Sequence, residues 1–268
     1  MSLRWNFSSR ARELSGGDAI VVSIPKSGRT WLRTFLCAYY CQRTGREFTL
    51  TPEQYCDPRI PRIVYSHDLF EERTKADWWA RVRGKYLIPA AEIRRAKIIL
   101  LVRDPRDAFV SLFIQLTRRT RETAAELKQK SAGELLRDPA FGIASMILTM
   151  NGWLREFSPL PAFHIVRYEA LQRAPADTFG QMLAFLGEKT ADAEALEYAL
   201  NFSDFGHMKQ MEAAGAFESK ILRAGDVADP ESFKVRRGQV GGHRDYLSAA
   251  ELEYAAREME KLDPRFGY

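Results

Sequence analysis

The sequence predicts a single-domain α/β fold with a central parallel sheet flanked by helices. Three observations lead to this prediction. The chain has 268 residues, a length that suits one large α/β domain. Short β-rich runs recur along it, and segments with helical periodicity separate them. Each β-rich run is also followed by polar residues, as expected where a binding site lies beyond the carboxyl ends of parallel strands.

The expected strands are β-rich runs at residues 19–24, 62–65, 97–102 and 163–166. Continuous apolar runs of this length are typical of parallel strands that helices cover on both faces. The residues that follow these runs directly or nearly so are Lys26, His67, Arg103 and Tyr168. Because parallel strands end at the same edge of a sheet, we expect these side chains to gather there.

Helical patterns fill the segments between and after the expected strands. They cover residues 30–40, 104–116, 134–157, 177–186, 191–199 and 249–262. Residues 51–54 and 248–251 both have the pattern of a capping box, and Asp104-Pro105 has that of a helix start. The chain contains no internal repeat and no linker. We therefore expect one domain at residues 1–268, with a binding core at about 18–248 and a C-terminal helix at 249–262.

The composition excludes some classes of protein and leaves others open. With 46% hydrophobic and 28% charged residues, it is ordinary for a globular chain. No apolar stretch is long enough to predict a membrane span, and residues 1–17 lack the apolar core of a signal peptide, so we expect a cytoplasmic location. The net charge of +5 suits an anionic ligand or plain solubility equally. Cys37, Cys41 and Cys56 are best interpreted as idle thiols.

The strongest local motif is Ile-Pro-Lys-Ser-Gly-Arg-Thr-Trp at residues 24–31, between an expected strand and an expected helix. Such a junction directs backbone N–H groups and the positive end of the helix toward an anion. Gly28 permits a tight backbone, and Lys26 adds a point charge. The motif has the physics of a P-loop without its GxxxxGK[ST] spacing, because the lysine precedes the glycine. An ordinary βα turn is the alternative interpretation of this segment alone.

Pro-Lys-Ser-Gly-x-Thr-Trp after a first strand resembles the 5′-phosphosulfate loop of sulfotransferases that use 3′-phosphoadenosine 5′-phosphosulfate (PAPS). The resemblance covers about residues 18–248 and implies a P-loop-like phosphate site with PAPS as the donor. It identifies the chain as similar to the cytosolic type of the family. The loop residues that it assigns to the donor are Lys26, Ser27, Gly28, Arg29, Thr30 and Trp31.

Two further blocks extend the resemblance to the donor's 3′-phosphate. Arg103, with Ser111 eight residues later, resembles the family's strand-end arginine and helix serine. A guanidinium at a strand end also offers a planar fork for a phosphate, although a structural salt bridge is as good an interpretation of Arg103 alone. The run Arg236-Arg237-Gly238-Gln-Val-Gly241 resembles the C-terminal loop of the family. By itself, this run would be read as a solvated turn.

The same resemblance implies an adenine pocket and the reacting groups. The adenine residues would be Trp31, Tyr168, Ser203 and Phe205. His67, in Tyr-Ser-His-Asp, resembles the catalytic histidine, and histidine is the natural base for an acceptor proton near neutral pH. The Lys26 ammonium would stabilise the charge on the leaving phosphate oxygen as the S–O bond breaks. The resemblance also implies that Ser27 keeps Lys26 away from the donor until the acceptor binds. No metal is expected.

Departures from the family pattern affect both halves of the site. Many members have a lysine two residues before the catalytic histidine, where this chain has Tyr65; Arg29 would then supply the missing charge. The family commonly has Asp-Trp after Gly241, where this chain has Gly242 and His243. The segment that forms dimers in cytosolic members is poorly matched, so we predict no such dimer.

The predicted activity is sulfuryl transfer from PAPS to a hydroxyl or amine of a small-molecule or glycan acceptor, by in-line displacement. A P-loop-like nucleotide kinase and a non-catalytic module binding RNA or another anionic polymer are the alternatives. The sequence leaves the acceptor and the oligomeric state open. A set of apolar side chains suits either an acceptor pocket or the core: Trp78, Trp79, Tyr86, Phe113 and Met146.

Overall fold

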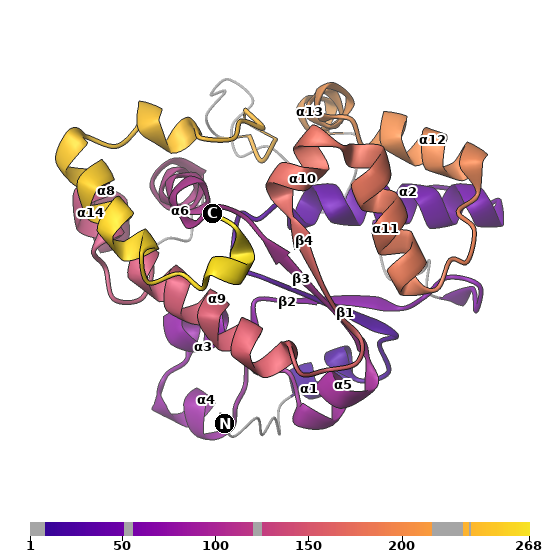
Figure 1. The fold of residues 1–268 in the computed structure, drawn as a ribbon, viewed down its shortest axis with the longest axis horizontal. Coiled ribbons are helices and arrows are strands. Elements are labelled where there is room, and N and C mark those ends of the chain that lie inside the picture. Colours follow the sequence, from indigo (N-terminus) through magenta and orange to yellow (C-terminus); the bar gives the residue numbers. More distant parts are fainter. Residues whose placement is uncertain (1–8, 51–55, 120–124, 216–232, 236) are drawn as a thin grey trace.

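The computed structural model describes residues 9–50, 56–119, 125–215, 233–235 and 237–268. Its described strands form one four-stranded parallel sheet in the order β2-β1-β3-β4 (Figure 1). The strands are β1 (Ala19–Ser23), β2 (Ile63–Ser66), β3 (Lys97–Val102) and β4 (Phe163–Arg167). They agree with the expected runs to within one residue at each end. The predicted parallel α/β fold is therefore confirmed.

Helices cover both faces of this sheet (Figure 1). The alternation of side chains along β1 explains how, because Ile20 and Val22 pack into one core cluster while Ala19 and Val21 pack into the other. The first cluster contains residues of α6 (Pro105–Ile114), α9 (Ile143–Phe157) and α14 (Ala249–Met259). The second contains residues of α2 (Arg29–Thr44), α11 (Pro175–Leu186) and α12 (Ala193–Phe202). The central strands β1 and β3 are buried because both layers are filled, whereas the edge strands β2 and β4 are partly exposed.

Shorter helices complete the described part of the chain. They are α1 (Ser9–Leu14), α3 (Asp68–Lys75), α4 (Trp78–Val82), α5 (Ala90–Arg95), α7 (Ala125–Gln129), α8 (Ala132–Leu136), α10 (Tyr168–Arg173), α13 (Phe205–Ala214), the π-helical η2 (Gln115–Arg119) and the 3₁₀ turns η5 (Gly242–Asp245) and η6 (Pro264–Phe266). The sequence patterns predicted neither α3 nor α10. Both begin immediately after a strand and carry residues of the candidate site.

The helix starts agree with the capping patterns that the structure describes. Asp104 accepts a hydrogen bond from the Arg106 N–H, and Ser248 forms a complete capping box with Glu251. The capping box predicted at residues 51–54 lies outside the described residues. The helix predicted to run to residue 116 ends at Ile114 instead, because its last turn widens into η2. In the ranges described here, no helix combines the length and apolarity needed to cross a bilayer.

Candidate active site

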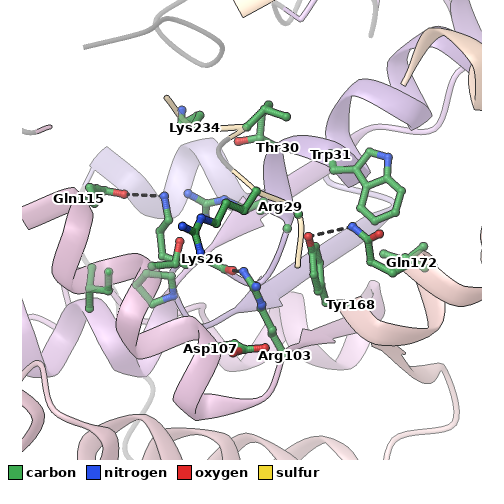
Figure 2. Close-up of a pocket in the computed structure, with 18 of the residues that line it drawn as sticks. Lys26, Arg29, Thr30, Trp31, Arg103, Asp107, Gln115, Tyr168, Gln172 and Lys234 are labelled. Atoms are coloured by element: carbon green, nitrogen blue, oxygen red, sulfur yellow. Dashed lines mark hydrogen bonds between the residues drawn. The ribbon is translucent and has the colours of Figure 1, made fainter. Parts of the chain in front are cut away.

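A cavity of about 680 Å³ lies at the carboxyl edge of the sheet. Its walls come from the β1–α2 loop, the starts of α3, α6 and α10, and the segment before η5. Figure 2 shows side chains of the β1–α2 loop, α6 and α10 facing one another. Lys26, His67, Arg103 and Tyr168 all line this cavity, as expected for residues that follow parallel strands.

The β1–α2 loop has the backbone that an anion site requires. Gly28 caps α2 in the left-handed conformation, with φ 93°. A Cβ atom on this residue would lie 2.6 Å from the Tyr168 ring, so the position accepts no larger side chain without a shift. Lys26 also has a positive φ of 69°, which is uncommon for a residue other than glycine and marks a strained turn. The N-terminus of α2 thus opens onto the cavity beside Lys26, Arg29 and Thr30.

Lys26 and Ser27 have different partners in this loop. The Lys26 ammonium donates a hydrogen bond to Gln115 Oε1 at 3.1 Å (Figure 2). Ser27 is buried, and its hydroxyl donates to the Ile24 carbonyl at 3.1 Å, which closes the turn. Gln115 begins the π-helical turn and lines the cavity. No sequence motif indicated Gln115, because 89 residues separate it from Lys26.

Arg103 joins three walls of the cavity. Its guanidinium donates to the Lys26 carbonyl at 3.2 Å and to the Gln239 carbonyl at 3.0 Å, and it lies 4.3 Å from the centre of the Tyr168 ring. Its Nε atom is buried and has no hydrogen-bond partner among the described residues. A buried donor of this kind fits an anionic ligand. Ser111, two turns along α6, lines the same cavity.

Aromatic side chains form one end of the cavity. The Trp31 and Tyr168 rings meet edge to face at 5.8 Å, and the Tyr168 hydroxyl accepts a hydrogen bond from Gln172 at 2.9 Å (Figure 2). Burial raises the pKa of Tyr168, which keeps its phenol neutral. Phe205 and Ser203 line this end as well. The Ser203 hydroxyl donates to the Ala199 carbonyl at 2.7 Å.

The C-terminal loop, defined here as residues 237–243, forms the opposite rim. Arg237 pairs with Asp245 at 2.9 Å and lines the cavity. Gly238 has φ 60°, and a Cβ atom on it would lie 2.6 Å from the Phe205 ring. Lys234, which the sequence interpretation did not single out, lines the cavity too (Figure 2). Arg236, predicted to contact the donor, lies outside the described residues.

His67 lies between the β1–α2 loop and α3. Its Nδ1 atom lies 2.6 Å from the Ser23 carbonyl oxygen. A carbonyl oxygen only accepts hydrogen bonds, so Nδ1 carries a proton, and in the neutral form of the ring the lone pair is on Nε2. Ser23 is the last residue of β1. The strand that leads into the β1–α2 loop therefore also orients the imidazole ring of His67, the predicted base.

The remaining residues discussed from the sequence lie in different environments. His164, on β4, stacks on Phe185 at 5.2 Å, and burial lowers its pKa. Arg33 lies 4.8 Å from the ring centre of Tyr65, the residue that replaces the family's lysine. Among the candidates for an acceptor pocket, Met146 is fully buried in the core, whereas Trp78 and Trp79 are 65% and 63% exposed. Apolar residues that line the cavity include Phe70, Leu112, Leu116 and Phe141.

Comparison with known proteins extends these observations beyond the cavity. A family model described as "Sulfotransferase domain" matches residues 17–262. The chain is 25% identical over 239 residues to the 3-alpha-hydroxysteroid sulfotransferase of Cavia porcellus, covering 88% of this chain and 80% of that protein. It is 25% identical over 280 residues to Sulfotransferase 2B1 of Homo sapiens, covering 96% and 68%.

Solved structures show the same fold. The mouse sulfotransferase SULT7A1 complexed with PAP aligns with a TM-score of 0.58 at 19% identity, covering 91% of this chain and 84% of that one. Retinol dehydratase in a complex with retinol and PAP aligns with a TM-score of 0.60 at 16% identity, covering 91% and 80%. Since the family model spans residues 17–262, the chain belongs to the sulfotransferase domain family and is an enzyme of the PAPS-dependent sulfotransferase class.

Proposed function

We propose that the enzyme transfers a sulfuryl group from PAPS to a hydroxyl or amine of a small-molecule acceptor by in-line displacement. His67 would take the acceptor's proton at Nε2. The Lys26 ammonium would offset the negative charge that grows on the leaving phosphate oxygen. Reactions of this kind depend on positioning and charge stabilisation more than on covalent catalysis.

The hydrogen bond between His67 and the Ser23 carbonyl carries this proposal. It fixes the tautomer that a general base requires, because the proton is on Nδ1 and the lone pair on Nε2. It also joins the base to β1, three residues before Lys26. The base and the cation of the donor loop therefore belong to one rigid unit of the fold.

The cavity has the groups that the donor needs. Its loop end offers the start of α2, with Lys26, Arg29 and Thr30, for the 5′-phosphosulfate. Arg103, with its buried Nε, and Ser111 suit the 3′-phosphate, together with Arg237, Gly238 and Arg236 from the sequence. The aromatic end, with Trp31, Tyr168, Phe205 and Ser203, suits adenine.

We also propose an acceptor with an apolar body. Phe70, Leu112 and Phe141 line the same cavity as His67, and one of the similar proteins is named as a hydroxysteroid sulfotransferase. The absence of a metal requirement, the cytoplasmic location and the extent of the donor-binding core at residues 18–248 stay predictions of the sequence.

His67→Gln tests the chemistry separately from donor binding. The substitution removes the base without adding bulk. We therefore expect the affinity for PAP (3′-phosphoadenosine 5′-phosphate, the donor without its sulfuryl group) to stay within about twofold, while turnover falls at least about 100-fold. Calorimetry with PAP measures the first quantity, and transfer from radiolabelled PAPS to a panel of acceptors measures the second.

His207→Gln is the matched control. His207 also places Nδ1 against a backbone carbonyl, that of Phe202 at 2.8 Å, but it does not line the cavity. We expect this variant to turn over normally. Full activity of His67→Gln would remove His67 from the mechanism, and an enzyme that does not bind PAP would remove the proposed function.

A further inference from the structure

A buried carboxylate on α6 holds the C-terminal loop in place. Asp107 lies in the first turn of α6 and is only 3% exposed. One of its oxygens accepts the Gly241 N–H at 2.7 Å. The other accepts the His243 N–H at 2.9 Å and lies 2.8 Å from His243 Nδ1. These partners are 134 and 136 residues away in the sequence, so the contact joins two distant segments.

Arg103, which directly follows β3, contacts the same loop. Its Nη2 atom donates to the Gln239 carbonyl at 3.0 Å. The loop is therefore held at residues 239, 241 and 243 from a single short stretch of the chain, residues 103–107. Arg103 also donates a hydrogen bond to the Lys26 carbonyl. The same stretch therefore contacts both the C-terminal loop and the phosphate loop on the other side of the cavity.

The contacts of Asp107 are energetically significant because the carboxylate is out of water. Burial alone raises the pKa of Asp107, but the hydrogen bonds from His243 and Gly241 and the nearby Arg103 charge outweigh it, and the pKa lies below its usual value. The group is thus ionised at neutral pH. Losing an acceptor here would leave buried N–H donors unpaired, which costs more than losing an exposed contact.

We propose that Asp107, with His243 as its partner, is a positioning residue that holds Arg237 and Gly238 at the rim of the donor cavity. His243 contributes both its backbone N–H and its Nδ1 atom to the contact with one Asp107 oxygen. The inference rests on the proposed function, since it assigns the C-terminal loop to the donor. Asp107 and His243 line the cavity themselves, and the role assigned to them is to hold the loop, while Arg237 and Gly238 face the donor.

Asp107→Asn tests the anchor in the full-length enzyme. The amide has the shape of the carboxylate but replaces one acceptor oxygen with a donor, which then faces a donor of the loop. We expect the Kd for PAP to rise about 10- to 100-fold. At saturating PAPS, kcat should change much less than KM. Hydrogen–deuterium exchange in residues 237–246 should become faster, while exchange in α2 stays unchanged.

Asp138→Asn is the matched control. Asp138 also accepts two backbone N–H groups, from Ala140 and Phe141, and pairs with one cation, Lys130, but it does not line the cavity. We expect this variant to lose thermal stability and to keep the wild-type Kd for PAP. Asp138 is half-buried, and the contrast with Asp107→Asn separates loss of the anchor from the loss of a similar set of carboxylate hydrogen bonds elsewhere in the fold.

Two variants of His243 test the anchor independently if Asp107→Asn folds poorly. His243→Ala removes the side-chain donor, whereas His243→Asn places an amide N–H near the position of Nδ1. We expect weaker PAP binding in the alanine variant and recovery in the asparagine variant. If His243→Ala and every folded Asp107 variant bind PAP as the wild type does, the anchor is wrong while the proposed function stands. If the wild type fails to bind PAP, both fall.

Discussion

The two rims of the cavity are built in different ways. The phosphate loop is a run of consecutive residues between β1 and α2, and its left-handed glycine lies at the helix start. The C-terminal loop has left-handed glycines as well, at Gly238 and Gly241, but its partners are Arg103 and Asp107 on another part of the chain. The phosphate loop therefore combines a local backbone turn with long-range contacts to Gln115, Arg103 and Tyr168, whereas the described contacts that hold the C-terminal loop against α6 are long-range ones.

Because of this difference, substitutions in the two rims should have different consequences. The phosphate loop continues directly from a buried strand into a buried helix, so a change there should disturb the fold and the donor site together. The C-terminal loop lies outside the sheet and its layers, so a change there should weaken donor binding with less effect on folding. The predictions below test this contrast in order of decreasing effect.

Gly28→Ala should have the largest effect. The new Cβ would meet the buried Tyr168 ring at 2.6 Å, and φ 93° is unfavourable for alanine. We expect a loss of about 2–4 kcal/mol in the free energy of unfolding, together with strongly weakened PAP binding. Chemical denaturation and calorimetry measure the two quantities.

Gly45→Ala is the control for this change, because Gly45 has φ 69° with no neighbouring heavy atom within 4 Å. It should cost only about 1 kcal/mol, the backbone part of the effect. Equal losses in the two variants would show that the contact with Tyr168 does not constrain the loop.

Gly238→Ala should have an intermediate effect, confined to donor binding. Its Cβ would meet the Phe205 ring at 2.6 Å and push the C-terminal loop away from the cavity. We expect PAP affinity to fall about tenfold with a stability loss near 1 kcal/mol. Gly241→Ala, with φ 77° and no heavy atom within 4 Å, keeps its N–H for Asp107 and serves as the control. A stability loss as large as that of Gly28→Ala would contradict the proposed contrast.

His164→Phe should have the smallest effect and gives a baseline away from both rims. Burial holds the pKa of His164 below its ordinary value of 6.5, so the unfolded chain binds the proton more readily than the folded one. Stability from this site is complete above pH 6.5 and is lost as the pH falls toward the lower folded-state pKa. Phenylalanine keeps the stack on Phe185 and removes this loss. Thermal melts from pH 7.5 to 5 should show about 1–3 °C less acid destabilisation in the variant.

Much of the fold was predictable because its signals are local. Apolar runs gave the strands, and the capping residues Asp104 and Ser248 marked true helix starts. The helix after β2 was missed because His67, its N-cap residue, makes no side-chain cap. The predicted end of α6 lies two residues beyond the observed end at Ile114. Nothing in the sequence pattern at Gln115 distinguishes a π-helical turn from an α-helix.

The candidate site divides along the same line. Lys26, Gly28, His67 and Arg103 follow strands and were found by position, and the structure lines one cavity with them. Gln115 and Asp107 were not singled out, although both contact residues of the predicted site. Their partners are 89 or more residues away, and a single sequence does not show which distant side chains meet.

By itself, the sequence determined the sheet, the phosphate loop and the family resemblance, because hydrophobic periodicity and backbone requirements act between near neighbours. Only the tertiary structure decided that the Lys26 ammonium meets Gln115, that Ser23 fixes the His67 ring, and that Asp107 holds the C-terminal loop. Those contacts depend on how the layers pack around the sheet, since the pairing of buried polar groups is settled only when distant segments share one interior.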